Sequence, residues 1–297
     1  MKSLEFSPLS LLVQAGDAAH NYLQSFNALP VAASDYALPN IWGWAEYFKL
    51  NWAFDRYGLA WIKQDYPVSC LWAPVGDWAK VPWAEYDFVP GQVVGRVPEP
   101  LVELWQKTVP NRIEAQEDMG AWDYVYLVSE LAELKGNRFH RKRNHYNQFL
   151  KLYNWEYKDL RPSDIEEVLT FQEKWLQNRE EEPSAALKAE NEVIRRVLLN
   201  WDKLPPMLGG LIYVDGELVS YTVCEELCSD MVVVHFEKAD LNYRGLYQAI
   251  NAMFLQHEGS RFTYVNREQD AGDEGLRKAK KSYNPVHYIK KYVVTFK

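Results

Sequence analysis

The spacing of hydrophobic and polar positions changes character along the chain. Up to about residue 135, short apolar runs alternate with prolines, which predicts short strands separated by turns and a helix directly after Pro100. From residue 161 onward the helical and strand periods are clear. The segments predicted there are a helix opened by Ser163, an acidic break at 180–183, a helix over 185–200, strands over 211–214, 217–223 and 231–237, a helix from 246, a strand over 262–266, a helix over 274–282 and a closing strand over 288–296.

Two local signals sharpen this order. Asp215 and Gly216 stand between two runs with period two, a combination that predicts a type I′ hairpin. Ser163 is followed three residues later by Glu166, which predicts a capping box at the start of a helix.

A basic helix is predicted over residues 137–153. At about 100° per residue its apolar side chains form one stripe, and Arg143 falls on that stripe. Arg143 therefore faces the protein body, where a charge must be paired or bound to a ligand. Lys142 is interpreted as surface charge. The apolar stripe consists of Phe139, Tyr146, Leu150 and Tyr153.

Charge is distributed unevenly. The formal net charge is -8, yet residues 134–155 carry six Lys/Arg and residues 275–297 carry seven, both without an acidic residue. Local potential, more than net charge, steers binding, so these segments indicate a site for an anionic ligand. The alternative is that they are two solvated helix faces. Whether the segments meet in space is left open by the sequence.

Composition indicates the number of domains and the expected cellular environment of the protein. A length of 297 residues with 47% hydrophobic content predicts about two folded domains. Three dispersed cysteines predict free thiols in a reducing cytosol, and no transmembrane segment is expected, so the expected localisation is cytoplasmic. No metal site is expected among the six histidines, and His235 is interpreted as a core or rim histidine. The acidic balance argues against general nucleic-acid binding.

The element order of the second half is that of a GNAT-type acyltransferase domain. In such a domain a strand leads into a helix whose free amides bind the donor's phosphates. Arg244 and Gly245 occupy that junction here and form the candidate donor loop. Tyr247 stands where a small residue is needed for close approach of a pyrophosphate, which makes coenzyme A a doubtful donor. The alternative for this loop is an ordinary turn.

Three motifs carry a resemblance to a known family. They are Asp123-Tyr124-Val125-Tyr126, then Leu134-x-Gly136 followed by His140, Lys142, Arg143 and Asn144, and finally Asn266-x-Glu268-x-Asp270 followed by Gly275, Leu276, Arg277, Ala279, Lys280, Ser282, Tyr283 and Pro285. With them the chain resembles the C-terminal domain of phosphatidylglycerol lysyltransferases, a GNAT-like family related to the Fem-type aminoacyltransferases. We expect a soluble, stand-alone member of that family.

The resemblance implies an α+β fold with two tandem GNAT-like (acyl-CoA N-acyltransferase-like) domains, each a mixed central sheet flanked by helices. The implied division is a degenerate N-terminal domain over 1–135, a basic helix and linker over 136–160, and a C-terminal domain over 161–297.

The resemblance also implies transfer of an aminoacyl group from aminoacyl-tRNA to an amine or hydroxyl. Such a reaction needs a base, a stabilised oxyanion and a hold on the anionic donor. The catalytic candidates are Glu268, Asp270 and Tyr283. The substrate-binding candidates are His140, Arg143, Asn144, Asn266, Arg277 and Lys281. The alternatives are a helix N-terminal acid cluster for the two carboxylates and a core tyrosine with a satisfied hydroxyl for Tyr283.

Two functions therefore stand side by side. The first is an aminoacyl- or acyl-transferase, for which aminoacyl-tRNA is the preferred donor over acyl-CoA. The alternative is a non-catalytic GNAT-like module that binds a nucleotide, a tRNA end or another anion. The expected partner in both cases is an anionic small molecule or the acceptor end of a tRNA.

Overall fold

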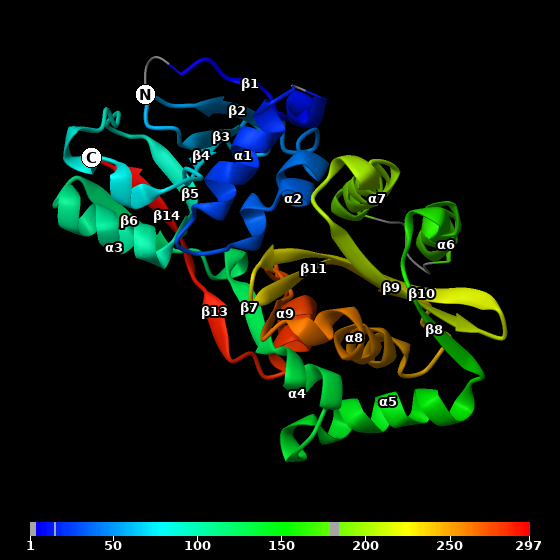
Figure 1. The fold of residues 1–297 in the computed structure, drawn as a ribbon. Helices are drawn as coiled ribbons and strands as arrows, with labels where there is room; N and C mark the ends of the chain where they lie inside the picture. Colours follow the sequence, from blue (N-terminus) through cyan, green and yellow to red (C-terminus); the bar gives the residue numbers. More distant parts are fainter. Residues whose placement is uncertain (1–3, 15, 179–183) are drawn as a thin grey trace. The chain divides into compact units, whose positions relative to one another are not determined.

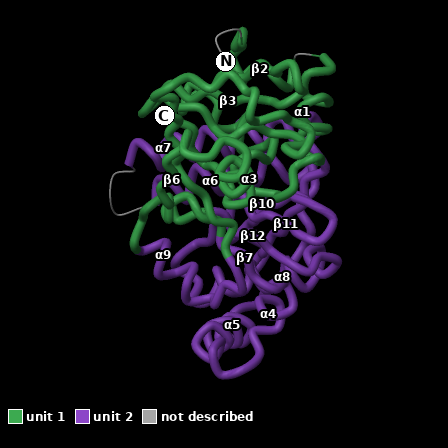
Figure 2. Tube along the Cα trace, turned by 90° about the vertical axis from the view of Figure 1, so that its left-hand side faces the viewer, with its two compact units in different colours: residues 1–123, 269–274, 288–297 green, residues 124–268, 275–287 purple. Residues whose placement is uncertain are grey.

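The computed structural model describes residues 4–14, 16–178 and 184–297, so the predicted acidic break at 180–183 lies outside the described residues. The chain forms two compact units, each built on its own sheet. Unit 1 comprises residues 1–123, 269–274 and 288–297, and unit 2 comprises residues 124–268 and 275–287 (Figure 2). The predicted division at residues 135 and 160 stays a prediction.

Unit 1 contains a mixed sheet whose described strands run in the order β1-β2-β3-β4-β5-β14-β6. β4 and β5 are parallel, whereas β14 is antiparallel to both of its neighbours, β5 and β6. The strands are β1 Ser7–Pro8, β2 Asn51–Phe54, β3 Ala60–Gln64, β4 Cys70–Trp72, β5 Val93–Pro98, β6 Ile113–Glu117 and β14 Lys291–Phe296. The helices are α1 Ala18–Asn27, α2 Leu38–Gly43 and α3 Glu99–Thr108.

The core of unit 1 is built largely from aromatic rings. Phe296 of β14 stacks on Phe88 with 3.6 Å between ring centroids, and Trp105 of α3 meets Phe88 edge to face at 5.5 Å. Such large rings bury much apolar area and pack with defined geometry. The C-terminal strand therefore contributes to the core of the unit that contains the N-terminus.

Unit 1 also buries an ion cluster. The ammonium of Lys291, fully shielded from solvent, donates to Asp35 and, at 2.6 Å, to Asp123, while Arg96 donates to Asp35. Burial opposes the charge on Lys291, but Asp123 and Asp35 outweigh it and raise the pKa of the amine. Each buried charge thus has an opposite partner, as burial requires.

Unit 2 is organised around a second mixed sheet, with described strands in the order β13-β7-β12-β11-β10-β9-β8. β11 and β12 are parallel, whereas β10 is antiparallel to both β11 and β9. The strands are β7 Asp123–Leu127, β8 Trp155–Asp159, β9 Met207–Val214, β10 Glu217–Cys228, β11 Met231–Ala239, β12 Tyr264–Asn266 and β13 His287–Ile289. The helices are α4 Val128–Glu133, α5 His140–Leu152, α6 Ile165–Gln177, α7 Ala185–Leu199, α8 Leu246–Gln256 and α9 Glu274–Lys281.

Helices cover both faces of this second sheet (Figure 1). On one face, Phe149 of α5 and Ile250 of α8 pack with Ile212 of β9 in a buried apolar cluster. On the other face, Tyr213 of β9 donates a hydrogen bond to Glu167 of α6. Because neighbouring residues of a strand point to opposite faces of the sheet, Ile212 faces α5 and α8, and Tyr213 faces α6.

Most predicted elements of the second half are confirmed, including the helix over 185–200 and the hairpin. Asp215 and Gly216 both have positive φ, as a type I′ turn requires. The capping box at Ser163 is wrong, because Asp164 accepts the backbone N–H of Arg161 instead. The closing strand over 288–296 is two strands, β13 and β14, which belong to different sheets. Among the described residues, none of the helices combines the length and apolar character needed to cross a bilayer.

Candidate functional site

Two parallel strands of unit 2 separate at the candidate site. β11 and β12 pair only from Met231 with Tyr264 to Val233 with Asn266. β11 continues to Ala239, whereas the chain after Asn266 turns to the other neighbour, where Arg267 N–H donates to the carbonyl of Tyr124. Beyond Val233 the two segments are therefore joined by side chains and not by a ladder of backbone hydrogen bonds.

His235 lies where β11 and β12 separate, and it also interrupts the pairing of β11 with its other neighbour, β10. Val234 pairs with Cys224 and Phe236 with Val223 of β10, so His235 is the extra residue of a β-bulge. Bulges re-aim side chains and are frequent beside active sites. Here the bulge places the imidazole between β10 and the segment after β12.

The imidazole of His235 is held between two carboxylates. Its Nδ1 lies 2.9 Å from Oε1 of Glu268, and its Nε2 lies 3.3 Å from Oε1 of Glu225. Burial lowers the pKa of His235, but the two carboxylates outweigh burial and raise it to about 9. The ring is therefore a cation at neutral pH, and the Glu225–His235–Glu268 array carries a net charge of about -1.

Glu268 forms the accessible end of this array. Its side chain is 18% exposed, compared with 3% for Glu225 and none for His235. Its backbone is in the left-handed region, with φ 57°, and its N–H donates to the side chain of Asn266 at 2.7 Å. A non-glycine residue held in that region points to a functional constraint on where the side chain lies.

A second group of side chains surrounds Tyr283, which follows α9. Arg267 pairs with Glu237 of β11 at 2.9 Å and lies 5.0 Å from the centre of the Tyr283 ring. Lys142 of α5 lies 4.0 Å from the same centre. Burial, and then the charge of Arg267, lower the pKa of Lys142. Two cations thus flank one buried phenol.

The hydroxyl of Tyr283 is oriented by its surroundings. Gln248 of α8 donates a hydrogen bond to it at 3.3 Å. Burial raises the pKa of Tyr283, although Arg267 opposes that rise. The phenol therefore stays protonated at neutral pH and retains a proton to donate.

The remaining carboxylate and amide candidates have diverse surroundings. Asp270 belongs to unit 1, where its side chain is fully buried and accepts the N–H of Gly272 at 2.9 Å. Asn266 is fully buried in unit 2, where it holds the backbone of Glu268. His140 and Asn144 are exposed one helical turn apart on α5, with 3.4 Å between their side-chain nitrogens.

The predicted basic candidates divide into two kinds. The guanidinium of Arg143 donates to the carbonyls of Leu134 at 2.6 Å and Gly136 at 3.0 Å, so it faces the protein body as expected but binds the backbone after α4. Arg277 is half-buried on α9, and Lys281 is exposed at its end. A clamp formed by all three side chains stays a prediction.

The donor loop before α8 is covered by α5. A Cβ on Gly245, whose φ is 86°, would lie 2.1 Å from the carbonyl oxygen of His145, so helix packing itself requires glycine there. The N–H of Arg244 donates to the hydroxyl of Tyr153 at 3.1 Å. With α5 so close and this amide occupied, the loop offers little room for a pyrophosphate.

Four residues of the candidate site were not predicted from the sequence. His235 was expected only as a core or rim histidine, and Glu225 and Arg267 were not considered. The interpretation of Lys142 as surface charge is wrong, because the side chain packs on Tyr283. The sequence contained one signal that could have pointed to this site. A histidine and an acidic residue, His235 and Glu237, stand at alternate positions of one predicted strand.

Residues 26–295 match the family model described as phosphatidylglycerol lysyltransferase, C-terminal. The chain belongs to this family. It is 28% identical over 174 residues to an uncharacterized protein of Mycoplasmoides gallisepticum, a match that spans 58% of this chain and 55% of that protein.

Solved structures extend the likeness across both units of this family member. A conserved protein of unknown function from Bacteroides thetaiotaomicron is 26% identical, with a TM-score of 0.83 over 99% of this chain and 100% of that chain. L-PGS from Bacillus licheniformis is 11% identical, with a TM-score of 0.58 over 83% of each chain. At that identity the likeness shows the fold alone.

The fold is that of tandem GNAT-like proteins. A tandem GNAT protein from the clavulanic acid biosynthesis pathway is 11% identical, with a TM-score of 0.52 over 99% of this chain and 98% of that chain. The predicted α+β class with two mixed sheets flanked by helices is thereby confirmed. Family and fold together suggest a GNAT-like transferase.

Proposed function

We propose that the protein transfers an aminoacyl group from aminoacyl-tRNA to an amine or hydroxyl acceptor. The observation that carries this proposal is the Glu225–His235–Glu268 array, which lies at the point where two parallel strands separate and has one carboxylate accessible to solvent. Membership of the lysyltransferase C-terminal family supports the class of reaction.

Glu268 acts as the general base in this proposal. The array holds two carboxylates and one imidazolium, so uptake of one proton makes it neutral. The acceptor gives its N–H or O–H proton to Glu268 while its nitrogen or oxygen bonds to the acyl carbon. The ester bond to the tRNA ribose then breaks, and the departing ribose oxygen takes the proton back from Glu268. The cycle returns the array to its starting charge.

Tyr283 stabilises the oxyanion of the tetrahedral intermediate. Because Gln248 donates to the phenol oxygen, the hydroxyl proton is directed elsewhere and can be donated to the developing charge. Lys142 and Arg267 lie against the faces of the same ring and add positive potential. A preorganised donor of this kind contributes on the order of 10²-fold or more to a rate.

The donor's phosphates are held by the exposed cations of α5 and α9. The two basic segments approach each other where Lys142 meets Tyr283, directly after α9. Arg141 of α5 and Lys281 of α9 are exposed on these helices. Such cations bind a polyanion with a strong dependence on salt concentration.

The test is transfer from a pool of radiolabelled aminoacyl-tRNAs to a panel of amines, hydroxyl compounds and lipids. Glu268→Gln should lower the rate by about 10² or more and keep tRNA affinity, because it removes the base and keeps the shape. The matched control is Glu156→Gln, an exposed carboxylate of β8 that should leave the rate unchanged. Failure of every aminoacyl-tRNA to bind, or an unchanged rate in Glu268→Gln, would contradict the proposal.

A further inference from the structure

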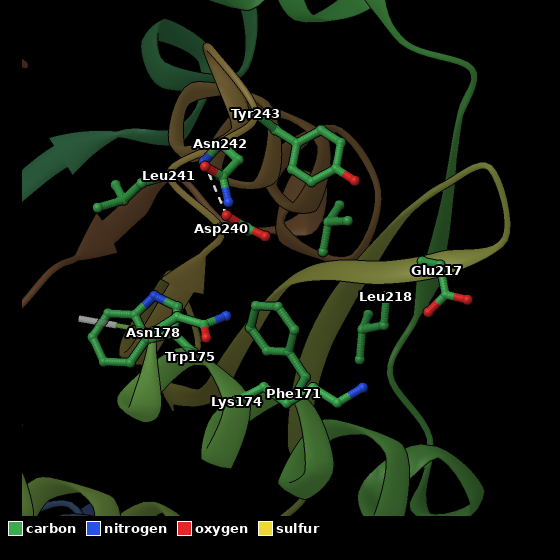
Figure 3. Close-up of a pocket in the computed structure, with 11 residues that line it drawn as sticks. Phe171, Lys174, Trp175, Asn178, Glu217, Leu218, Asp240, Leu241, Asn242 and Tyr243 are labelled. Atoms are coloured by element: carbon green, nitrogen blue, oxygen red, sulfur yellow. Dashed lines mark hydrogen bonds between the residues drawn. The ribbon is translucent and has the colours of Figure 1, made fainter. Parts of the chain in front are cut away.

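Unit 2 contains a pocket that the proposed transfer reaction does not use. Its volume is 540 Å³, and its walls come from α6, the first residues of β10 and the loop between β11 and α8 (Figure 3). Asp240, on that loop, follows His235 by five positions along extended chain, a separation of roughly 16 Å. The pocket is therefore distinct from the Glu268 site.

Aromatic rings form much of the pocket wall. Phe171 and Trp175 come from α6, and Tyr243 comes from the loop before α8. The Trp175 ring is fixed by a hydrogen bond of 3.0 Å from its Nε1 to the carbonyl of Ala239. Tyr243 is fixed by edge-to-face contact with Tyr153, with 5.1 Å between ring centroids. The rings are thus held in place before any ligand arrives.

Carboxylates accompany these rings. In Figure 3 the side chain of Asp240 points into the space between the rings of Phe171 and Tyr243, and Glu217 lies at the start of β10. Asp240 is anchored, because its Oδ1 accepts the N–H of Asn242 at 2.9 Å. Among the described residues that line the pocket, Lys174 is the one cation, and it is exposed on α6.

The described side chains that line the pocket carry two carboxylates, Asp240 and Glu217, and one ammonium, Lys174. The ammonium of Lys238, which pairs with Glu190, lies 4.8 Å from the centre of the Trp175 ring. Burial, followed by the nearby charges of Asp240 and Asp215, raises the pKa of Tyr243. Aromatic faces attract cations, and carboxylates do so more strongly when partly shielded from water. A phosphate would meet repulsion from Asp240 and Glu217, whereas an ammonium would meet complementary charge on one side and ring faces on the others.

We propose that this pocket binds a small organic ammonium with an apolar body, whose charge lies beside Asp240 and whose carbon skeleton packs between Phe171, Trp175 and Tyr243. Leu218 and Val219 of β10 supply the apolar remainder of the wall. Asp240 and the aromatic rings favour a positively charged ligand, and the apolar wall favours a ligand with an apolar carbon skeleton.

The test compares two probes of nearly the same shape, benzylamine, which is protonated at neutral pH, and benzyl alcohol, which is uncharged. Ligand-observed NMR titration of the full chain at pH 7 should show benzylammonium binding about fivefold or more tightly than benzyl alcohol. Asp240→Asn keeps the acceptor for Asn242 and removes the charge, and it should erase that preference. Asp202→Asn, an exposed aspartate outside the pocket, is the matched control and should leave it intact.

Three results would overturn the inference. They are equal affinity for the two probes, no binding of benzylammonium at millimolar concentration, and competition by inorganic phosphate. If Asp240→Asn strongly lowers the melting temperature of the protein, Glu217→Gln, a substitution at an exposed residue, replaces it as the test variant. It should weaken the binding of benzylammonium and leave the binding of benzyl alcohol unchanged. Because no transfer activity is measured, the outcome does not depend on the proposed reaction.

Discussion

The ammonium of Lys142 lies 4.0 Å from the centre of the Tyr283 ring. This contact joins the basic helix α5 to the segment after α9, two regions more than a hundred residues apart in the sequence. Through it the two basic segments of the sequence meet beside Arg267, which also lies against the Tyr283 ring. The proposed function rests on this contact and on the Glu225–His235–Glu268 array.

Replacement of Lys142 by Met tests the link between this contact and donor binding. The variant keeps the packing of the stem on Tyr283 and removes the charge, so the fold should persist. We expect affinity for aminoacyl-tRNA to fall by about fivefold and the slope of log affinity against log salt to decrease by about one. Filter binding at several salt concentrations measures both. A variant that binds tRNA with the original slope would show that Lys142 does not contact the donor.

The charge on His235 predicts how the stability of the protein depends on pH. The pKa of His235 is raised from 6.5 to about 9 in the folded protein. The charged ring of His235 therefore stabilises the folded protein fully below about pH 6.5, and this stabilisation is lost as the pH rises to about 9. A rise of this size corresponds to roughly 3 kcal/mol in the free energy of unfolding.

Denaturant unfolding from pH 6 to pH 9.5 measures that dependence. His235→Gln, which cannot titrate, should be less stable at pH 6 and should show a flatter profile across the same range. If the profiles of the two proteins run parallel, His235 is not the titrating group, and the array does not hold a proton as described.

Gly245 should be intolerant of any side chain. A Cβ would meet the carbonyl oxygen of His145 at 2.1 Å, a backbone atom that cannot move aside. Gly136 has the same φ of 86° but nothing within 4 Å of its Cβ position. Gly136→Ala should therefore cost only the backbone strain, about 1 kcal/mol, whereas Gly245→Ala should cost several kcal/mol more. Equal losses in thermal or denaturant unfolding would show that α5 does not pack on this loop.

Substitution of the adjacent lysines Lys290 and Lys291 in unit 1 should have very different effects on the free energy of unfolding. Lys291→Met leaves the buried carboxylates of Asp35 and Asp123 without their shared cation, at a cost of about 3–5 kcal/mol. Lys290, whose ion pair with Glu99 is largely solvated, is the matched control, and Lys290→Met should change stability little. Comparable unfolding midpoints for the two variants would contradict the description of the buried cluster.

Local sequence determined many of the elements. The Asp215-Gly216 turn, the helix after Ser184 and the apolar period of α8 each follow from contacts within a few residues, so they were predicted close to their observed bounds. The orientation of Arg143 toward the protein body also followed from helix geometry, but its partners, the carbonyls of Leu134 and Gly136, did not.

Only the tertiary structure decided the site and the placement of the C-terminus. β14 lies between β5 and β6, and β11 separates from β12 after three residue pairs, because strand pairing depends on residues far apart in the sequence. The β-bulge at His235 depends on the register between β10 and β11, which no local pattern encodes. The sequence by itself thus determined the elements and the family. Long-range packing decided that Glu225, His235 and Glu268 meet, and that Lys142 lies on Tyr283.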